Sequence, residues 1–284
     1  MSSEFGGTIA FGVLSLLLFL IGKRIGFFEF SPQEWRVPIR LVHVIGAFAI
    51  YFLASFFLAK LLVIVLKKQI MLHFMAYSSL LNFTLSFAVL IFLGIYFKSL
   101  PSLLTTGILR RGPQRPSIID DVWAALTAWI MAFPLVLFFS QLLEWILMKV
   151  FHLTLLPEQI AVRFLKSSFE SPFYFILAFL SIVVLAPLIE ETLFRGFLQS
   201  YIRQHLGARQ AVVITSVCFS LFHYSAGQGI GNISIILSLF LLALFLGFLY
   251  EKRGSLLAPM ILHGTFNLVS VVNLYLFGGF SSGL

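Results

Sequence analysis

Long runs of apolar residues alternate with short polar segments along most of the chain. A helix crosses the hydrocarbon core of a bilayer in about 20 mostly apolar residues, and these runs reach or approach that length. They are apolar at successive positions, whereas the strands of a membrane barrel would alternate between apolar and polar. The pattern predicts an all-α polytopic membrane protein with about eight spans, near Gly7–Gly22, Leu41–Leu66, Phe74–Phe97, Val122–Met148, Phe173–Ser200, Ala208–Gly227, Ile233–Tyr250 and Leu256–Phe277.

The composition excludes an ordinary soluble domain, because 60% of the 284 residues are hydrophobic and only 11% are charged. The net charge of +8 does not indicate nucleic-acid binding, since most Lys and Arg residues follow the first, third, fifth and seventh runs. Loops rich in Lys and Arg usually face the cytoplasm. We therefore expect these loops in the cytoplasm and both chain ends on the opposite side. No positive residue precedes the first run, so we expect a retained span and not a signal peptide.

The Arg- and Pro-rich segment Arg110–Pro116 is the clearest linker in the chain. We predict N-terminal transmembrane helices with a cytoplasmic linker at 1–115, and a five-helix candidate catalytic core at 116–284. A short amphipathic stretch from Leu156 to Lys166 predicts a helix at the membrane interface, with Phe164 and Leu165 on the lipid side.

Three polar signatures interrupt the apolar C-terminal half: Glu190–Arg195, Phe219–His223 and His263–Asn267. An ionisable side chain within a span costs roughly 2.5–3.5 kcal/mol on insertion scales, so such residues usually form pairs or functional sites. Their joint occurrence in one half of the chain therefore predicts a polar site inside the helix bundle.

Helical spacing assigns partners within the signatures. Glu191 and Arg195 are four residues apart on one helix and are expected to pair. Glu190 points about 100° away from that pair and is left for another partner. His263 and Asn267 are also four residues apart, so they share a helix face.

Depth in the bilayer brings the signatures together. Counted from the expected cytoplasmic helix ends, Glu190, His223, His263 and Asn267 lie roughly 20, 22, 12 and 18 Å deep, at about 1.5 Å per residue. A carboxylate beside a histidine can hold and deprotonate a water molecule. A histidine and an asparagine can stabilise the oxyanion of a tetrahedral intermediate. Together these groups are sufficient for peptide hydrolysis without a side-chain nucleophile.

A metal site is the chemical alternative. Glu190, His223 and His263 form a carboxylate–imidazole set that suits zinc. Nothing in the sequence requires the metal: no His-Glu-x-x-His helix is present, and the single cysteine, Cys218, excludes a multi-thiolate site. Asn267 suits a donor role better than a ligand role, so we expect no cofactor.

The motifs Glu-Glu-x-x-x-Arg, Phe-x-x-x-His and His-x-x-x-Asn, in this order, resemble those of the type II CAAX prenyl endopeptidases. That superfamily also contains bacteriocin-processing and abortive-infection membrane proteins of bacteria. The segments Phe194–Gly196 and Tyr250–Leu256 are similar to family members as well. The resemblance covers about residues 170–270 and rests on three spaced motifs that agree.

The resemblance implies an intramembrane endopeptidase of the plasma (cytoplasmic) membrane that cuts near the C-terminus of a lipidated or membrane-docked substrate. By motif position it implies a catalytic glutamate at Glu190, a water-binding histidine at His223, oxyanion donors at His263 and Asn267, and supporting residues at Glu191 and Arg195.

Two other functions are compatible with polar motifs inside the helix bundle. Some relatives in the superfamily act as scaffolds or immunity factors, so the motifs can be kept for packing alone. A transporter or proton pathway would also bury ionisable groups, but it predicts an inverted repeat with broken helices in both halves. The polar motifs of this chain lie in one half only, and the endopeptidase is therefore the expected function.

Overall fold

The computed structural model of the protein describes residues 2–30, 37–67, 74–109, 117–153, 159–169 and 171–277, which are mostly helical and contain no strand. The all-α prediction is confirmed. The predicted linker Arg110–Pro116 and the start of the predicted amphipathic stretch lie outside the described residues.

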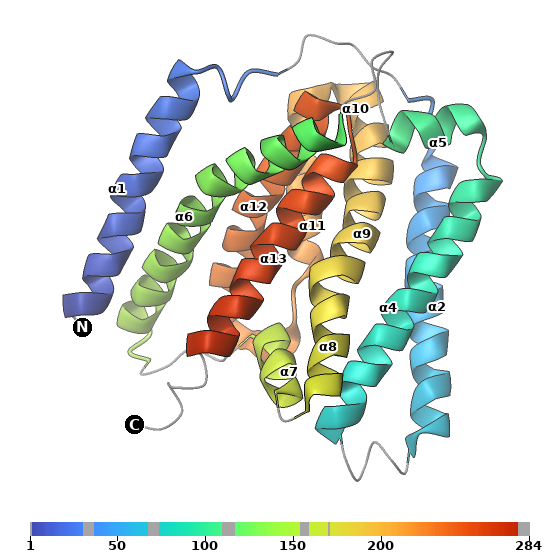
Figure 1. The fold of residues 1–284 in the computed structure, drawn as a ribbon, viewed down its shortest axis with the longest axis horizontal. Coiled ribbons are helices and arrows are strands. Elements are labelled where there is room, and N and C mark those ends of the chain that lie inside the picture. Colours follow the sequence, from blue (N-terminus) through green and yellow to red (C-terminus); the bar gives the residue numbers. More distant parts are fainter. Residues whose placement is uncertain are drawn as a thin grey trace.

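The described helices follow the apolar runs (Figure 1). The N-terminal part contains α1 (Ser2–Arg24), α2 (Leu41–Val65), α4 (Phe74–Ser99), α5 (Ser102–Leu109), α6 (Ile118–Val150) and α7 (Ile160–Ser168). The C-terminal part contains α8 (Pro172–Leu180), η1 (Ser181–Leu185), α9 (Ala186–Glu191), η2 (Thr192–Gln199), α10 (Ser200–Leu206), α11 (Ala208–Phe222), η3 (Ala226–Gly231), α12 (Asn232–Arg253) and α13 (Leu257–Phe277). The segments η1 and η2 are π-helical, and η3 is a 3₁₀-helix.

Within the described ranges, seven helices are long and apolar enough to cross a membrane. They are Gly6–Arg24, Leu41–Val65, Tyr77–Ser99, Ile118–Val150, Pro172–Leu206, Ala226–Arg253 and Leu257–Phe277. The predicted sixth span is shorter than expected, because α11 has 15 residues and ends at Phe222. At about 1.5 Å per residue it is roughly 22 Å long, less than the hydrocarbon thickness of about 30 Å.

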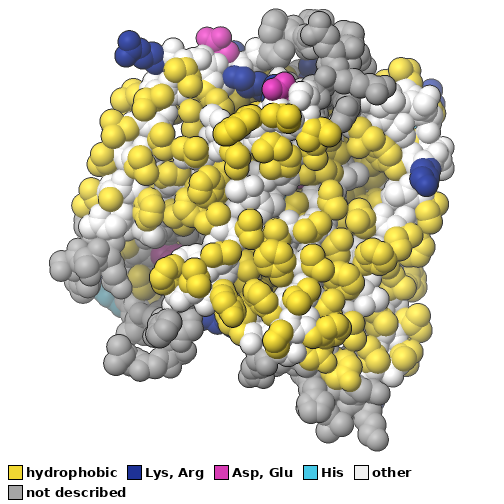
Figure 2. Space-filling model, viewed as in Figure 1, with side chains coloured by type: hydrophobic (Ala, Val, Ile, Leu, Met, Phe, Trp, Pro, Cys, Tyr) yellow, Lys and Arg dark blue, Asp and Glu magenta, His cyan; other side chains and the backbone are white. Residues whose placement is uncertain are grey.

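The outer faces of the bundle are apolar, as an integral membrane protein requires. Figure 2 shows hydrophobic side chains across the middle of one face, with charged side chains along its upper edge. Leu16 and Phe19 of α1 and Phe57 of α2 are examples of exposed large apolar side chains. The start of α1 and the end of α13 lie at the same end of the bundle (Figure 1), as the predicted topology requires. Which end faces the cytoplasm stays a prediction.

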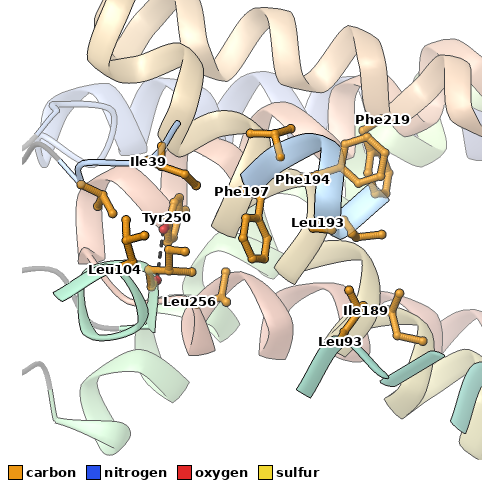
Figure 3. Close-up of a cluster of buried hydrophobic side chains, with 14 of the residues drawn as sticks. Ile39, Leu93, Leu104, Ile189, Leu193, Phe194, Phe197, Phe219, Tyr250 and Leu256 are labelled. Carbon is orange, nitrogen blue, oxygen red and sulfur yellow. Dashed lines mark hydrogen bonds between the residues drawn. The ribbon is translucent and has the colours of Figure 1, made fainter. Parts of the chain in front are cut away.

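Inside the bundle, α12 packs against α6, α11 and α13, and the pair α2 and α4 covers the rod formed by α8 to α10. The centre is aromatic: Phe194 and Phe197 of η2 are buried, and the Phe194 ring lies 5.1 Å from the Phe219 ring of α11 (Figure 3). This core packs the rod that contains Glu190–Arg195 against α11, which contains Phe219.

The segment Tyr250–Leu256 connects several helices at one end of the bundle. The Tyr250 hydroxyl donates to the carbonyl of Ile108 in α5 at 3.1 Å, and the Leu256 amide donates to the Leu109 carbonyl at 3.1 Å. The Glu251 carboxylate pairs with Arg203. These contacts join the segment to α5 and α10.

The amphipathic stretch forms a helix, α7, over the described part of its predicted range. Leu165 does not face lipid as predicted, because it is buried in a cluster with Ala178 of α8 and Val271 of α13. The position of α7 at the membrane interface stays a prediction.

Candidate functional site

The rod from α8 to α10 is not a regular α-helix. The π-helical segments η1 and η2 stand directly before and after α9, which ends with Glu190 and Glu191. Single π-turns inside α-helices occur frequently at functional sites. Pro187 explains part of the irregularity, because proline has no N–H group and its ring clashes with the carbonyl four residues earlier.

Glu191 and Arg195 form the predicted pair. Arg195 Nη1 lies 3.0 Å from Glu191 Oε1, and both side chains are 0% exposed. Arg195 Nη2 also donates to the Ala243 carbonyl of α12 at 3.2 Å, and the guanidinium lies 4.5 Å from the centroid of the Phe219 ring. The guanidinium therefore connects α9 and η2 with α11 and α12.

His263 of α13 joins this pair. Its Nδ1 lies 2.9 Å from Glu191 Oε1, and its side chain is only 6% exposed. Because an ionised carboxylate only accepts hydrogen bonds, the Nδ1 atom carries the proton in this contact. The second ring nitrogen, Nε2, lies 3.9 Å from Glu190 Oε2.

His223 approaches Glu190 from the other side. It follows the last residue of α11, and its Nδ1 lies 2.8 Å from the Phe219 carbonyl. A carbonyl accepts and cannot donate, so Nδ1–H is the donor and the neutral ring presents the lone pair of Nε2. That atom lies 3.7 Å from Glu190 Oε2. The structure thus brings Glu190, His223 and His263 together from three different helices.

Asn267 lies one turn after His263 on α13 but forms its contact elsewhere. Its Nδ2 donates to the Ile182 carbonyl of η1 at 2.8 Å. Among the described residues, no contact joins Asn267 directly to the carboxylate and imidazole groups. An amide nitrogen has two N–H bonds, so this contact uses one and leaves the other.

Exposure separates the site into two parts. The Glu190 and His223 side chains are 16% and 29% exposed, respectively. Glu191, Arg195 and His263 are buried behind them. The accessible edge therefore contains one carboxylate and one imidazole, and the buried part orients the second imidazole.

Sequence reasoning missed several contributors to the site. The carbonyls of Phe219, Ala243 and Ile182 orient three of the side chains, yet every residue has a carbonyl and the sequence contains no signal for it. Tyr51 of α2 was also missed. Its ring lies 5.4 Å from the ring of Phe222, which precedes His223. A lone tyrosine in an apolar span gave no indication of this.

No group of three or more His, Cys, Asp or Glu side chains within the described part of the chain is arranged to hold a metal ion. The Nδ1 atoms of His223 and His263 already contact a carbonyl and a carboxylate, which leaves Nε2 as the free nitrogen of each ring. Zinc bound to Glu190 and these two nitrogens stays the untested alternative.

The comparison with known families concerns the same part of the chain. Residues 172–269 match the family described as Rce1-like, type II CAAX prenyl endopeptidase Rce1-like. This segment is similar to that family. The matched range includes all three signatures, so the resemblance predicted from them is confirmed. No curated protein and no solved structure gives a significant match to the chain. The Rce1-like family is a protease family, and the match supports a hydrolase in an integral membrane protein.

Proposed function

We propose that the protein is an integral membrane endopeptidase of the glutamate type, which hydrolyses a peptide bond of a membrane-docked substrate. The observation that carries the proposal is the position of Glu190 Oε2, which lies 3.7 Å from His223 Nε2 and 3.9 Å from His263 Nε2. These separations exceed a direct hydrogen bond and suit groups that act on a molecule between them.

Glu190 and His223 would activate the attacking water. The carboxylate and the Nε2 lone pair are both acceptors, so one water molecule can donate a hydrogen bond to each. As the water oxygen attacks the scissile carbonyl, its proton passes to one of these two acceptors. The same group then protonates the departing amine, and the site returns to its starting state.

His263 and Asn267 would stabilise the oxyanion of the intermediate. Because His263 Nδ1–H donates to Glu191, an N–H at Nε2 requires the cationic ring. The remaining N–H of Asn267, oriented by the Ile182 carbonyl, would supply another donor.

The position of the site in a membrane-spanning rod and the family match support a membrane-docked substrate. A peptide held at the bilayer by a lipid or an apolar segment can bring its peptide bond to this depth. We propose a prenylated CAAX-type peptide as the first substrate to examine, with an unmodified membrane peptide as the comparison.

The test is cleavage of these two peptides in liposomes by wild type and by Glu190→Gln, which keeps the shape of the side chain but removes its charge. We expect wild type to cleave at least one peptide and Glu190→Gln to lose at least 10²-fold in turnover. Glu144→Gln is the matched control, because Glu144 of α6 is a partly buried carboxylate bonded to Ser140 and Ser234 outside the site. Wild type that cleaves neither peptide, or Glu190→Gln with full turnover, would contradict the proposal and favour a scaffold or immunity role.

A further inference from the structure

Two neighbouring backbone carbonyls in η1 do not accept from the residue four positions later, as they would in a regular α-helix. The Val183 carbonyl would accept from residue 187 in an α-helix, but Pro187 has no N–H. The Ile182 carbonyl would accept from the Ala186 N–H in an α-helix, but that N–H donates to the Ser181 carbonyl. In a π-helix its donor would be residue 187, which is again the proline. We call the Ile182 and Val183 carbonyls the η1 carbonyl pair.

A buried carbonyl without a donor is unfavourable in a protein and more so in a membrane. Asn267 of α13 supplies a donor to one of these carbonyls, because its Nδ2 donates to the Ile182 carbonyl at 2.8 Å. The contact joins α13 to the rod that contains Glu190 and Glu191, and it depends on the carbonyl that Pro187 and the π-turn leave free.

Gly264 of α13 lies against the second member. A Cβ atom built on Gly264 would lie 3.0 Å from the Val183 carbonyl oxygen. Ordinary carbon–oxygen contacts are longer, at about 3.3–3.6 Å, so a side chain here would move the two helices apart. Because Gly264 directly follows His263, such a movement would act on the imidazole that contacts Glu191.

We propose that Pro187 and Gly264 are positioning residues of the site: Pro187 frees the η1 carbonyl pair, and Gly264 lets α13 approach it so that His263 reaches both glutamates. The two residues act through backbone contacts and do not touch the reacting groups. The expected consequence for turnover rests on the proposed function, whereas the consequence for the His263–Glu191 contact does not.

The experiment compares Pro187→Ala and Gly264→Ala with two matched controls in the full-length protein. Pro172→Ala removes an exposed proline at the first position of α8, where no helical donor is needed. Gly94→Ala adds a methyl group where nothing lies within 4 Å. The imidazole ¹⁵N signals of His263 and His223 are recorded for each variant, and turnover and KM are measured on the cleaved peptide.

We expect Pro187→Ala and Gly264→Ala to shift the His263 Nδ1 signal, because the 2.9 Å contact with Glu191 lengthens. The His223 signal is the internal control and should stay in place, since its partner, the Phe219 carbonyl, is on its own helix. Turnover should fall by about tenfold with little change in KM, and the larger Gly264→Val should lose about 10²-fold, as misplacement of a catalytic group predicts. Both controls should match wild type.

Unchanged His263 signals in both site variants would overturn the proposal, as would equal shifts in the controls. Pro187→Ala restores a backbone N–H donor, and alanine favours a helix more than proline does. We therefore expect this variant to fold, so the test remains possible if Gly264→Ala does not fold. A wild-type protein that cleaves no peptide while the His263 shifts occur as expected would overturn the proposed function and support the positioning roles.

Discussion

Glu191 Oε1 lies 2.9 Å from His263 Nδ1 while the same oxygen lies 3.0 Å from Arg195 Nη1. One buried carboxylate oxygen therefore orients an imidazole on α13 and neutralises a guanidinium on η2. Glu190, the next residue in the chain, faces a different pair of groups. The two adjacent glutamates thus have different partners.

Arg195→Ala should destabilise the protein by about 3–5 kcal/mol, because it leaves the buried Glu191 carboxylate without its guanidinium. Thermal unfolding in detergent measures the effect. Arg209→Ala, which removes an exposed arginine at the start of α11, is the control and should melt as wild type does. A wild-type melting temperature for Arg195→Ala would show that the pair does not stabilise the fold.

His223→Gln should lower turnover by about 10²–10⁴-fold, since it removes one of the two acceptors for the attacking water. The protein should stay folded, because this side chain is 29% exposed at the end of α11. His205→Gln, an exposed histidine at the end of α10, provides the comparison. Turnover within a few-fold of wild type in His223→Gln would remove this imidazole from the mechanism.

Asn267→Ala should lower turnover by about 10²–10³-fold with a much smaller change in substrate affinity, as expected for an oxyanion donor. It should also reduce stability by about 1–3 kcal/mol, because the Ile182 carbonyl loses its donor. Turnover, affinity and unfolding are measured together, with the exposed Asn82→Ala as control. Loss of stability without loss of turnover would leave Asn267 a structural role only.

Wild type should contain no stoichiometric zinc and should keep its turnover after treatment with a chelator, because the proposed mechanism uses Glu190 and His223 alone to activate water. Elemental analysis of the purified protein is the measurement. One zinc per chain that is lost in both His223→Gln and His263→Gln would replace this scheme with a metal-activated water.

The sequence predicted the features that depend on side-chain type and spacing. Continuous apolar runs located the spans, and the separation of four residues paired Glu191 with Arg195. Similar depths in different helices predicted Glu190 beside His223, as the structure has them. His263, counted roughly 8 Å shallower at about 1.5 Å per residue, lies beside Glu190 as well.

The sequence could not predict features that depend on the backbone of neighbouring helices. Asn267 was assigned as a donor to substrate, but the Ile182 carbonyl became available to it only through Pro187 and a π-turn. Leu165 was placed toward lipid because its position on α7 says nothing about the cluster that covers it. Tyr51, outside the matched segment, packs against Phe222 next to His223, and no motif marks it.

The short α11 connects the site to the thickness of the surrounding lipid. This helix is roughly 22 Å long, about 8 Å less than an average hydrocarbon core, and it ends beside His223. A bilayer adapts to a short helix by thinning around it, at a modest cost for each ångström of mismatch. We therefore expect the distance from bulk water to His223 to depend on the acyl-chain length of the surrounding lipids as well as on the protein.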